Sequence, residues 1–191
     1  MQKPIKYAIF RTKWGYFGLA GTEDALCRTH LPEPEPEKLK SHLLKSLPLE
    51  CRVSSIEYRA SSIEFDKTFF KTIQEQIVAY FDCVRVNFSP DIPLSLDGFG
   101  CFFRSVLTAS RRVTFGQTIT YAALAKKVSC PRAARAVGNA LAANPLPLII
   151  PCHRVIRSDG KIGGFSAFGG KDTKTRLLRH ENAVLVAFKN A

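Results

Sequence analysis

The chain has 191 residues, of which 46% are hydrophobic, and its formal net charge is +12. This composition supplies enough apolar side chains for a packed core and excludes a disordered, charge-rich chain. No apolar run approaches the roughly 20 residues of a membrane-spanning helix. The N-terminal sequence MQKPIKYAIFRTKWGYF has too short an apolar stretch for a secretory signal. We therefore expect a soluble cytoplasmic protein without a membrane partner.

The positive charge is confined to the second half of the chain. Residues 1–100 hold 13 Lys/Arg and 13 Asp/Glu, whereas residues 101–191 hold 15 Lys/Arg and 3 Asp/Glu. A neutral half followed by a basic half is typical of a protein that binds a polyanion, most often nucleic acid. A solvated basic face that aids solubility explains the charge equally well.

The six cysteines are spread along the chain, and no pair has the spacing of a zinc knuckle or a redox motif. An even number permits disulfides, but a chain with an ordinary core does not need them, so we expect reduced thiols. Most should be small buried side chains. They are Cys27, Cys51, Cys83, Cys101, Cys130 and Cys152.

The first half of the chain predicts a small antiparallel sheet. Its strands are short apolar runs separated by turn residues, with a Thr-Lys-Trp-Gly turn between the first two. These runs are Tyr7–Arg11, Tyr16–Ala20 and Ala25–His30. Arg52–Tyr58 is a candidate further strand. The PEPEPE stretch at residues 32–37 is unsuited to a central strand and is expected to lead into a short helix over Lys38–Ser46.

A longer helix and a linker end the first half. Asp66 is the expected N-cap of a helix that runs to about Asp82. Its apolar face comprises Phe69, Phe70, Ile73, Ile77 and Phe81. Residues 87–98 are rich in Pro, Ser and Asp, and the charge changes at the same place. We therefore divide the chain near residue 95 into an N-terminal domain, residues 1–95, and a C-terminal domain, residues 96–191.

The second half is expected to be mostly helical. Phe99–Arg112 predicts a helix, and Thr118 or Thr120 is the expected cap of a short helix that ends near Val128. The side chains of the first helix that should face inward are Phe103, Val106 and Leu107.

A tight turn then joins two helices. Ser129-Cys130-Pro131 forms the turn, and Arg132–Ala143 is an Ala-rich helix that ends at Asn144-Pro145. Two short helices joined in this way resemble a helix-turn-helix. The pattern is only moderately specific, because helical hairpins are common in proteins that never bind DNA.

Cys152 and His153 carry the most informative chemistry. They end the segment NPLPLIIPCHRV, directly after an apolar run. A thiol reacts as its thiolate, so it needs a base or a positive environment, which His153 and nearby arginines supply. Taken alone, the pair is more typical of a buried, inert cysteine beside a surface histidine.

The pair does not stand alone, because several linked motifs surround it. The segment IPCHRV resembles the active-site signature of the O6-alkylguanine-DNA alkyltransferases, also called methylated-DNA–protein-cysteine methyltransferases. The resemblance covers about Phe99 to Glu181 and is looser in WGYFGLAGTEDALCRTHLP of the first half. Its other motifs are FGQTITYAALAKKV, PRAARAVGNALAANPLPL, GKIGGFSAFGG and KTRLLRHE.

The resemblance implies an α/β fold with two parts. The N-terminal part would be ribonuclease-H-like, a small antiparallel sheet plus a helix, and the C-terminal part mostly helical with the helix-turn-helix. It also implies direct DNA repair, in which an alkyl group moves irreversibly from O6 of guanine to Cys152. One molecule would repair one lesion without a cofactor, as a monomer on double-stranded DNA containing O6-alkylguanine. Activity on O4 of thymine stays open.

The resemblance also assigns the proton chemistry. His153 would draw the proton from Cys152 through a bridging water, and Glu181 would orient and balance that imidazole. Tyr121 would donate to N3 of guanine, so that the base leaves as a neutral species. Asn144 would brace the turn that holds the cysteine.

Further residues would bind the substrate and the DNA. Ser166 would donate a hydrogen bond near O6, and the carbonyls of Cys152 and Val155 would read the exocyclic amine. Because the lesion lies inside a stacked duplex, the nucleotide must rotate out, and Arg135 would fill the gap. Small residues would let the helix approach the minor groove. The DNA-binding set is Arg135, Ala134, Gly138 and Arg154.

The sequence departs from the common family pattern around the pocket. Ser166 is followed by Ala167-Phe168, where many members have Gly or Pro, so the preferred alkyl size is open. The neighbourhood of Cys27 and His30 lacks a full set of metal ligands, so we expect no metal.

Two other functions compete with alkyl transfer. A lesion sensor of the alkyltransferase-like type would keep the helix-turn-helix and the arginine but lack the acceptor thiol, and Cys152 argues against it. A transcriptional regulator would not need the Cys-His-Glu set, and no effector domain is visible.

Overall fold

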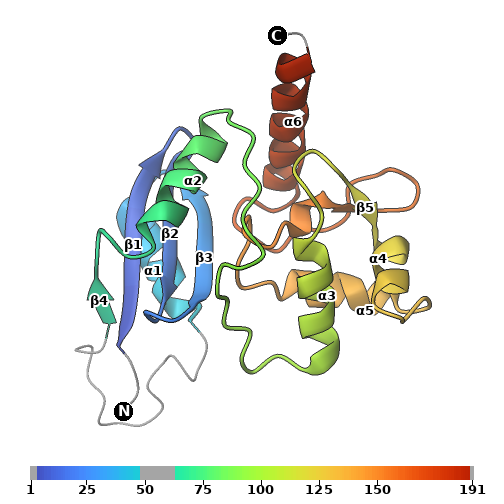
Figure 1. The fold of residues 1–191 in the computed structure, drawn as a ribbon, viewed down its shortest axis with the longest axis horizontal. Coiled ribbons are helices and arrows are strands. Elements are labelled where there is room, and N and C mark those ends of the chain that lie inside the picture. The colour runs from blue at the N-terminus through green and yellow to red at the C-terminus, as the bar shows by residue number, and fades with distance from the viewer. Residues whose placement is uncertain (1–3, 48–62, 190–191) are drawn as a thin grey trace.

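The computed structural model describes residues 4–47 and 63–189. A β-sheet flanked by helices forms the N-terminal part, and most of the remaining chain is helical (Figure 1). The first-half elements are β1 Ile5–Thr12, β2 Gly15–Gly21, β3 Leu26–Glu33, α1 Pro36–Lys45, β4 Ile63–Phe65 and α2 Lys71–Phe81. Those that follow are α3 Cys101–Arg111, β5 Ile119–Thr120, α4 Tyr121–Lys127, α5 Ala134–Ala142, the 3₁₀ turn η2 Cys152–Arg154, β6 Val155–Ile156 and α6 Gly170–Lys189.

The sheet has the strand order β3-β2-β1-β4. The first three strands are antiparallel, as predicted, and β4 adds to β1 in parallel. The turn between β1 and β2 contains Gly15 at φ +127°, where a Cβ atom would approach the Glu33 carbonyl oxygen to 2.7 Å. The predicted strand Arg52–Tyr58 lies outside the described residues.

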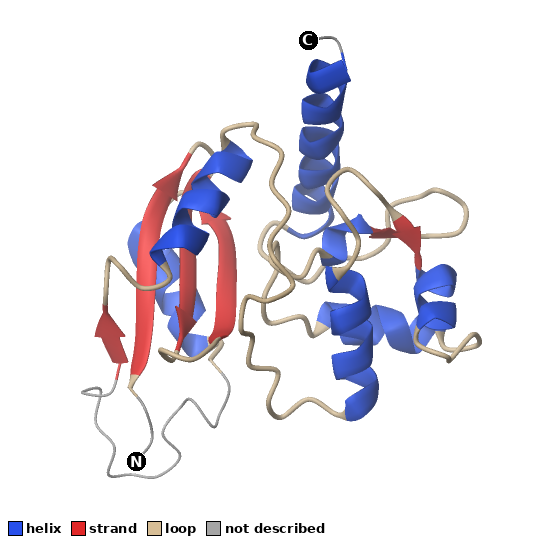
Figure 2. Ribbon diagram, viewed as in Figure 1, coloured by secondary structure: helices blue, strands red, loops and turns tan. Residues whose placement is uncertain are grey.

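Alternating side chains give the sheet two apolar faces, because successive strand residues point to opposite sides. Helix α2 lies in front of the sheet and α1 behind it (Figure 2). Phe17 and Leu19 of β2 pack in the same apolar cluster as Ile77 of α2, whereas Ala20 packs in the cluster that contains Leu43 of α1. Burying these chains on both sides stabilises the sheet.

The predicted start of α2 is wrong by several residues. The helix begins at Lys71, after Phe70 adopts a left-handed conformation with φ 50°. Asp66 does not cap it. Its carboxylate instead accepts hydrogen bonds from the backbone and hydroxyl of Thr68 and closes a turn. An Asp that bonds its own backbone two residues on favours a turn over a helix start.

The two helices α4 and α5 form the predicted helical hairpin. Thr120, not Thr118, is the N-cap of α4, and its Oγ1 accepts from the Ala123 amide at 3.1 Å. Helix α5 begins at Ala134 instead of Arg132, because the Ala133 amide bonds to the Cys130 carbonyl and extends the turn. In α3, Val106 and Leu107 are buried as predicted, whereas Phe103 is only partly buried.

The outer edge of β3 is covered by residues 93–95, at the end of the N-terminal half, and by residues 145–147 of the second half. The Leu26 amide donates to the Pro93 carbonyl, and the Ser95 amide donates back to Leu26. Further along, the Thr29 amide and hydroxyl donate to the carbonyls of Pro145 and Pro147. An open strand edge invites unwanted pairing, so these bonds protect it. They also anchor the chain just before the Cys152 turn to the sheet.

No helix in residues 4–47 and 63–189 is long and apolar enough to cross a membrane.

Candidate active site

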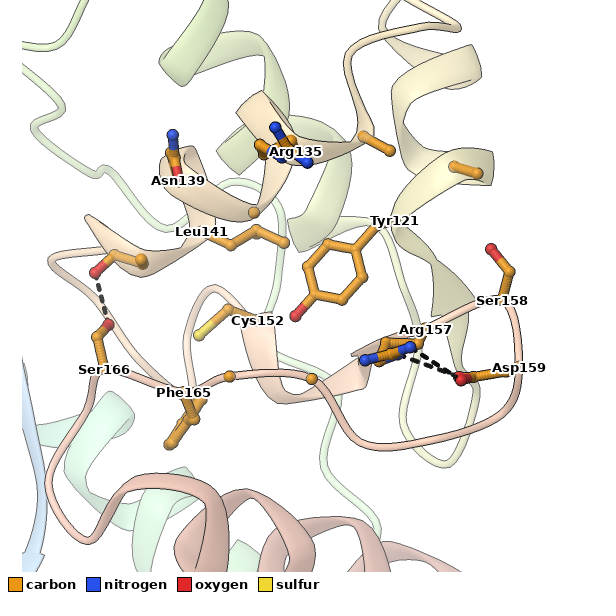
Figure 3. Close-up of a pocket in the computed structure, with 16 residues that line it drawn as sticks. Tyr121, Arg135, Asn139, Leu141, Cys152, Arg157, Ser158, Asp159, Phe165 and Ser166 are labelled. Carbon is orange, nitrogen blue, oxygen red and sulfur yellow. Dashed lines mark hydrogen bonds and ion pairs between the residues drawn. The ribbon is translucent and has the colours of Figure 1, made fainter.

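A pocket of about 920 Å³ lies between the helical hairpin and the loop that precedes α6. Helix α4 contributes Tyr121, α5 contributes Arg135, and η2 contributes Cys152. The Tyr121 hydroxyl and the Cys152 sulfur point into the same space (Figure 3). The pocket therefore places an aromatic hydroxyl, a thiol and an exposed guanidinium around one cavity.

Cys152 is held by the backbone before it. The Asn144 side-chain amide donates to the Ile150 carbonyl at 2.9 Å and to the Cys152 sulfur at 3.1 Å, and its oxygen accepts from the Leu146 amide. Asn144 therefore spans the turn, in the position that the family resemblance implies. Burial raises the pKa of the Cys152 thiol, while the Asn144 hydrogen bond and the positive Lys174 oppose that rise. The resting group is a thiol that needs a base.

His153 points away from the pocket into the protein. Its side chain is fully buried, and Nε2 lies 2.8 Å from Oε1 of Glu181. Nδ1 has no hydrogen-bond partner within the described residues. Burial lowers the pKa of His153, against the opposing effect of Glu181. The imidazole is therefore neutral at pH 7, with Nε2–H donated to Glu181 and Nδ1 left as a proton acceptor.

Glu181 is buried yet ionised, because several donors surround it. Its carboxylate accepts from the Gly116 amide at 2.8 Å, from the Tyr80 hydroxyl at 3.0 Å and from the Arg154 guanidinium at 2.9 to 3.1 Å. Burial alone would raise the pKa of Glu181, but hydrogen bonds from His153 and Arg154 and the positive charge of Arg154 outweigh it and lower the pKa to about 2. A full negative charge therefore faces His153 inside the core.

The predicted role of Arg154 in DNA binding is wrong. Its side chain is only 5% exposed. The guanidinium pairs with Glu181, and its Nη1 donates to the Val113 carbonyl at 2.6 Å. A buried carboxylate requires a paired cation, and Arg154 is that cation. Arg154 of the IPCHRV motif therefore stabilises the protein interior by pairing with Glu181.

Lys174 is a site residue that the sequence reading missed. It is buried, and its ammonium donates to the Val155 carbonyl at 2.6 Å and to the Tyr121 hydroxyl and Gly164 carbonyl at 3.4 Å. Burial lowers the pKa of Lys174, while Cys152 opposes that shift. The spacing of residues in the sequence could have indicated its burial. One buried stripe of α6 recurs at helical spacing and comprises Lys174, Leu177, Glu181 and Val184.

Tyr121 begins α4 with its ring half-buried in the pocket. Burial raises its pKa, so the hydroxyl keeps its proton. Gly163 lies directly against the ring: a Cβ atom there would sit 2.5 Å from the hydroxyl oxygen and 2.8 Å from Cε2. A side chain at position 163 would therefore have to push the Tyr121 ring aside.

Four of the remaining predicted residues line the pocket, whereas Val155 is buried and does not. Ala134 and Gly138 line it from α5, and Arg135 is exposed beside them. Ser166 lines the opposite wall, where its hydroxyl donates to the Ala142 carbonyl. The carbonyl of Val155 accepts from Lys174, as described above. Asn139 of α5 also lines the pocket and was not predicted.

The geometry of the site indicates the class of protein to which the chain belongs. A buried thiol aimed into a pocket, with a neutral histidine and an ionised glutamate behind it, is the arrangement of a protein that uses cysteine as a nucleophile.

Comparison with known proteins identifies the family. Residues 101–183 match the family described as 6-O-methylguanine DNA methyltransferase, DNA binding domain. A methylated-DNA–protein-cysteine methyltransferase of Methanosarcina acetivorans is 33% identical over 93% of this chain and 98% of its own. The corresponding protein of Methanosarcina barkeri is 43% identical over 66% of this chain and 76% of its own.

A solved structure agrees in fold. The crystal structure of Mycobacterium tuberculosis OGT in complex with DNA matches with a TM-score of 0.71 and 29% identity, covering 94% of each chain. The chain belongs to the methylated-DNA–protein-cysteine methyltransferase family. This confirms the family and the mixed α/β fold, with its N-terminal sheet and C-terminal helices, that the motifs predicted.

Proposed function

We propose that this protein repairs DNA by moving an alkyl group from O6 of guanine onto Cys152, once per molecule. The observation that carries the proposal is the Cys152 sulfur in the pocket wall, with the His153–Glu181 pair directly behind it. Family membership supports the same reaction. The product is a thioether, and no described group in the pocket would reverse it, so the protein is consumed by its own reaction.

The proton of the thiol must leave before or during attack. Nδ1 of His153 is the acceptor, and we place a bridging water between it and Cys152, because adjacent residues cannot easily bond side chain to side chain. Glu181 is ionised and holds the imidazole in the tautomer that keeps Nδ1 free. General bases oriented in this way contribute roughly 10²–10⁴-fold in rate.

The leaving group must gain a proton for the atoms to balance. The sulfur forms a bond to the alkyl carbon, the carbon–O6 bond breaks, and the electron pair moves into the guanine ring. Tyr121 donates a proton to N3, and Lys174, 3.4 Å from the Tyr121 hydroxyl, restores it. The proton taken by His153 balances the one delivered to the base. Because ordinary guanine carries its proton on N1 and not on N3, exchange with solvent then converts the N3-protonated base into unmodified guanine.

DNA would meet the protein at the pocket rim. The excess charge of +12 lies in residues 101–191, where it can neutralise phosphates. Arg135 is exposed at the rim, near the start of α5, and its small neighbours Ala134 and Gly138 leave room for a DNA backbone. We propose that Arg135 fills the stack while the damaged nucleotide occupies the pocket. The protein would act as a monomer, divided into domains near residue 95.

The direct test is intact mass after incubation with a duplex that contains one O6-methylguanine. One added methyl per molecule, absent in Cys152→Ala, is the expected result. No mass change with tight, lesion-selective binding would replace the proposal with a lesion sensor. No mass change and no lesion preference would leave a basic DNA-binding protein.

A further inference from the structure

A second cluster of reactive side chains lies away from the alkyl pocket, where the end of β3 meets α1. His30 and Glu33 come from β3, and His42 comes from α1. Their potential ligand atoms all lie within 4.8 Å of one another. Nδ1 of His42 is 3.0 Å from Oε2 of Glu33, and Nε2 of His30 is 3.9 Å from the same oxygen. Three donors thus converge on one point.

A β-bulge makes this convergence possible. Residues three apart on a regular strand point to opposite faces, so His30 and Glu33 should diverge. The register between β2 and β3 shifts here: Gly18 pairs with His30, but Tyr16 pairs with Glu33. Two steps on β2 therefore match three on β3, and the extra residue returns Glu33 to the side of His30. Bulges of this kind re-aim side chains.

The cluster is held in place before any ligand arrives. Nδ1 of His30 lies 2.8 Å from the Leu31 carbonyl, which fixes the proton on Nδ1 and leaves the lone pair of Nε2 toward Glu33. A backbone carbonyl behind the second ring nitrogen is the usual support of a metal-binding histidine. The Glu33 side chain is only 5% exposed, so its carboxylate is fixed by packing. His42, half exposed, completes the set from the solvent side.

We propose that His30, Glu33 and His42 bind a divalent transition-metal ion of the zinc class. Two imidazole nitrogens and one carboxylate oxygen form three corners of a tetrahedron, with the fourth open to water. Bonds of about 2.0–2.1 Å place tetrahedral donors about 3.3 Å apart. The 3.0 Å pair is close to this spacing, and the 3.9 Å pair must close by about half an ångström. The nitrogens of the two imidazoles lie within 4.8 Å of each other.

The donor set favours such an ion over harder cations. The site supplies two imidazoles and a single carboxylate. Calcium and magnesium depend on several oxygen ligands, whereas imidazole suits zinc and its neighbours. The types of donor atom therefore make the site selective for zinc-class ions over calcium and magnesium. The proposal differs from the expectation of no metal, which considered the neighbourhood of Cys27 and His30. The Cys27 thiol donates to the Ala20 carbonyl.

The metal would also stabilise one wall of the molecule near the alkyl pocket. The Phe168 ring lies 5.6 Å from the His30 ring and 6.5 Å from the His42 ring. Phe168 follows Ser166, which lines both hollows, by two residues. Fixing the two imidazoles fixes the surface on which Phe168 packs. Metal binding itself does not depend on the alkyl-transfer proposal, and its test does not use that reaction.

The test is a titration of metal-free, full-length protein with Zn²⁺, followed by imidazole ¹⁵N NMR, and with Co²⁺, followed by absorption. The expected result is one ion per chain. The signals of His30 and His42 should shift while those of His153 and His180 stay in place. The Co²⁺ spectrum should lack the charge-transfer band of a thiolate ligand. A sulfur–cobalt band would assign the ion to a cysteine and overturn the proposal.

Matched variants complete the test. His42→Ala should lower zinc affinity about 100-fold and abolish the rise in melting temperature that zinc gives the wild type, because losing a direct ligand exceeds the 10–100-fold effect of losing its support. Ser41→Ala, at the exposed neighbouring position of α1, should change neither. Glu33→Gln should also lower the zinc affinity. The melting temperature of each metal-free variant shows whether it still folds. Unchanged affinity in His42→Ala would refute the site.

Discussion

The buried carboxylate of Glu181 gives the sharpest prediction for stability. In Glu181→Gln the side chain keeps its shape but loses its charge, and one of its two acceptor oxygens becomes an NH₂ group. The Arg154 guanidinium, 5% exposed, then lies in the core without a countercharge. Breaking a buried pair by removing one partner costs about 3–5 kcal/mol. For a chain of this size that corresponds to a fall in melting temperature of roughly 10 °C.

The pH dependence gives an independent measure of the same interaction. The pKa of Glu181 is lowered from 4.5 to about 2. A carboxyl whose folded pKa is depressed contributes stability above its unfolded pKa and loses it as the pH falls through the folded pKa. The shift corresponds to roughly 3 kcal/mol. The stability gap between wild type and Glu181→Gln should therefore be complete above pH 4.5 and shrink as the pH falls toward 2.

Urea unfolding at a series of pH values measures both effects. Glu35→Gln is the matched control, because Glu35 pairs with Lys38 at 2.7 Å with both side chains more than half exposed. Exposed pairs contribute about 0–1 kcal/mol, so this variant should resemble the wild type. A loss below 1 kcal/mol in Glu181→Gln, or a gap that does not change with pH, would refute the view that Glu181 is an ionised partner of Arg154.

Three further predictions concern the pocket. Gly163→Ala should push the Tyr121 ring aside and slow alkyl transfer, whereas Gly164→Ala, which has no atom within 4 Å of the added Cβ, should react normally. Lys174→Met should slow the reaction with free O6-benzylguanine, because the positive Lys174 opposes the rise that burial gives to the pKa of the Cys152 thiol, and an unchanged rate would exclude Lys174 from the chemistry. Arg135→Ala should weaken repair of duplex lesions far more than reaction with free O6-benzylguanine; equal losses would end its proposed role in the DNA stack.

The sequence predicted the fold well where local patterns decide it. Alternation gave the three antiparallel strands, and the Ala-rich run before Asn144-Pro145 gave α5. The errors occur where the same residue type is compatible with two different local structures. Asp66 can cap a helix or close a turn, and only the left-handed Phe70 that follows shows that the helix starts later.

The candidate site was likewise predicted well where local motifs decide it and poorly where contacts between distant residues decide it. Cys152, His153, Glu181 and Tyr121 lie inside ordered motifs, and the structure brings them together around and behind one pocket. Arg154 was misplaced because its charge suggests the surface, while its partner stands 27 residues away on α6. The His30–Glu33 convergence was beyond pattern reading, because it depends on a bulge, and a bulge reverses which face a strand residue occupies.

Glu181 links the chemistry of the pocket to the assembly of the whole chain. Its carboxylate receives Tyr80 from α2, the Gly116 amide from the loop after α3, and Arg154 and His153 from η2. The tautomer of His153 therefore depends on contacts from both halves of the chain. Because a hydrogen-bonded network loses more than one member when a single partner shifts, a change that loosens α2 should slow alkyl transfer although α2 does not line the pocket. We therefore infer that the N-terminal half, through the Tyr80–Glu181 hydrogen bond, helps to prepare Cys152 for reaction.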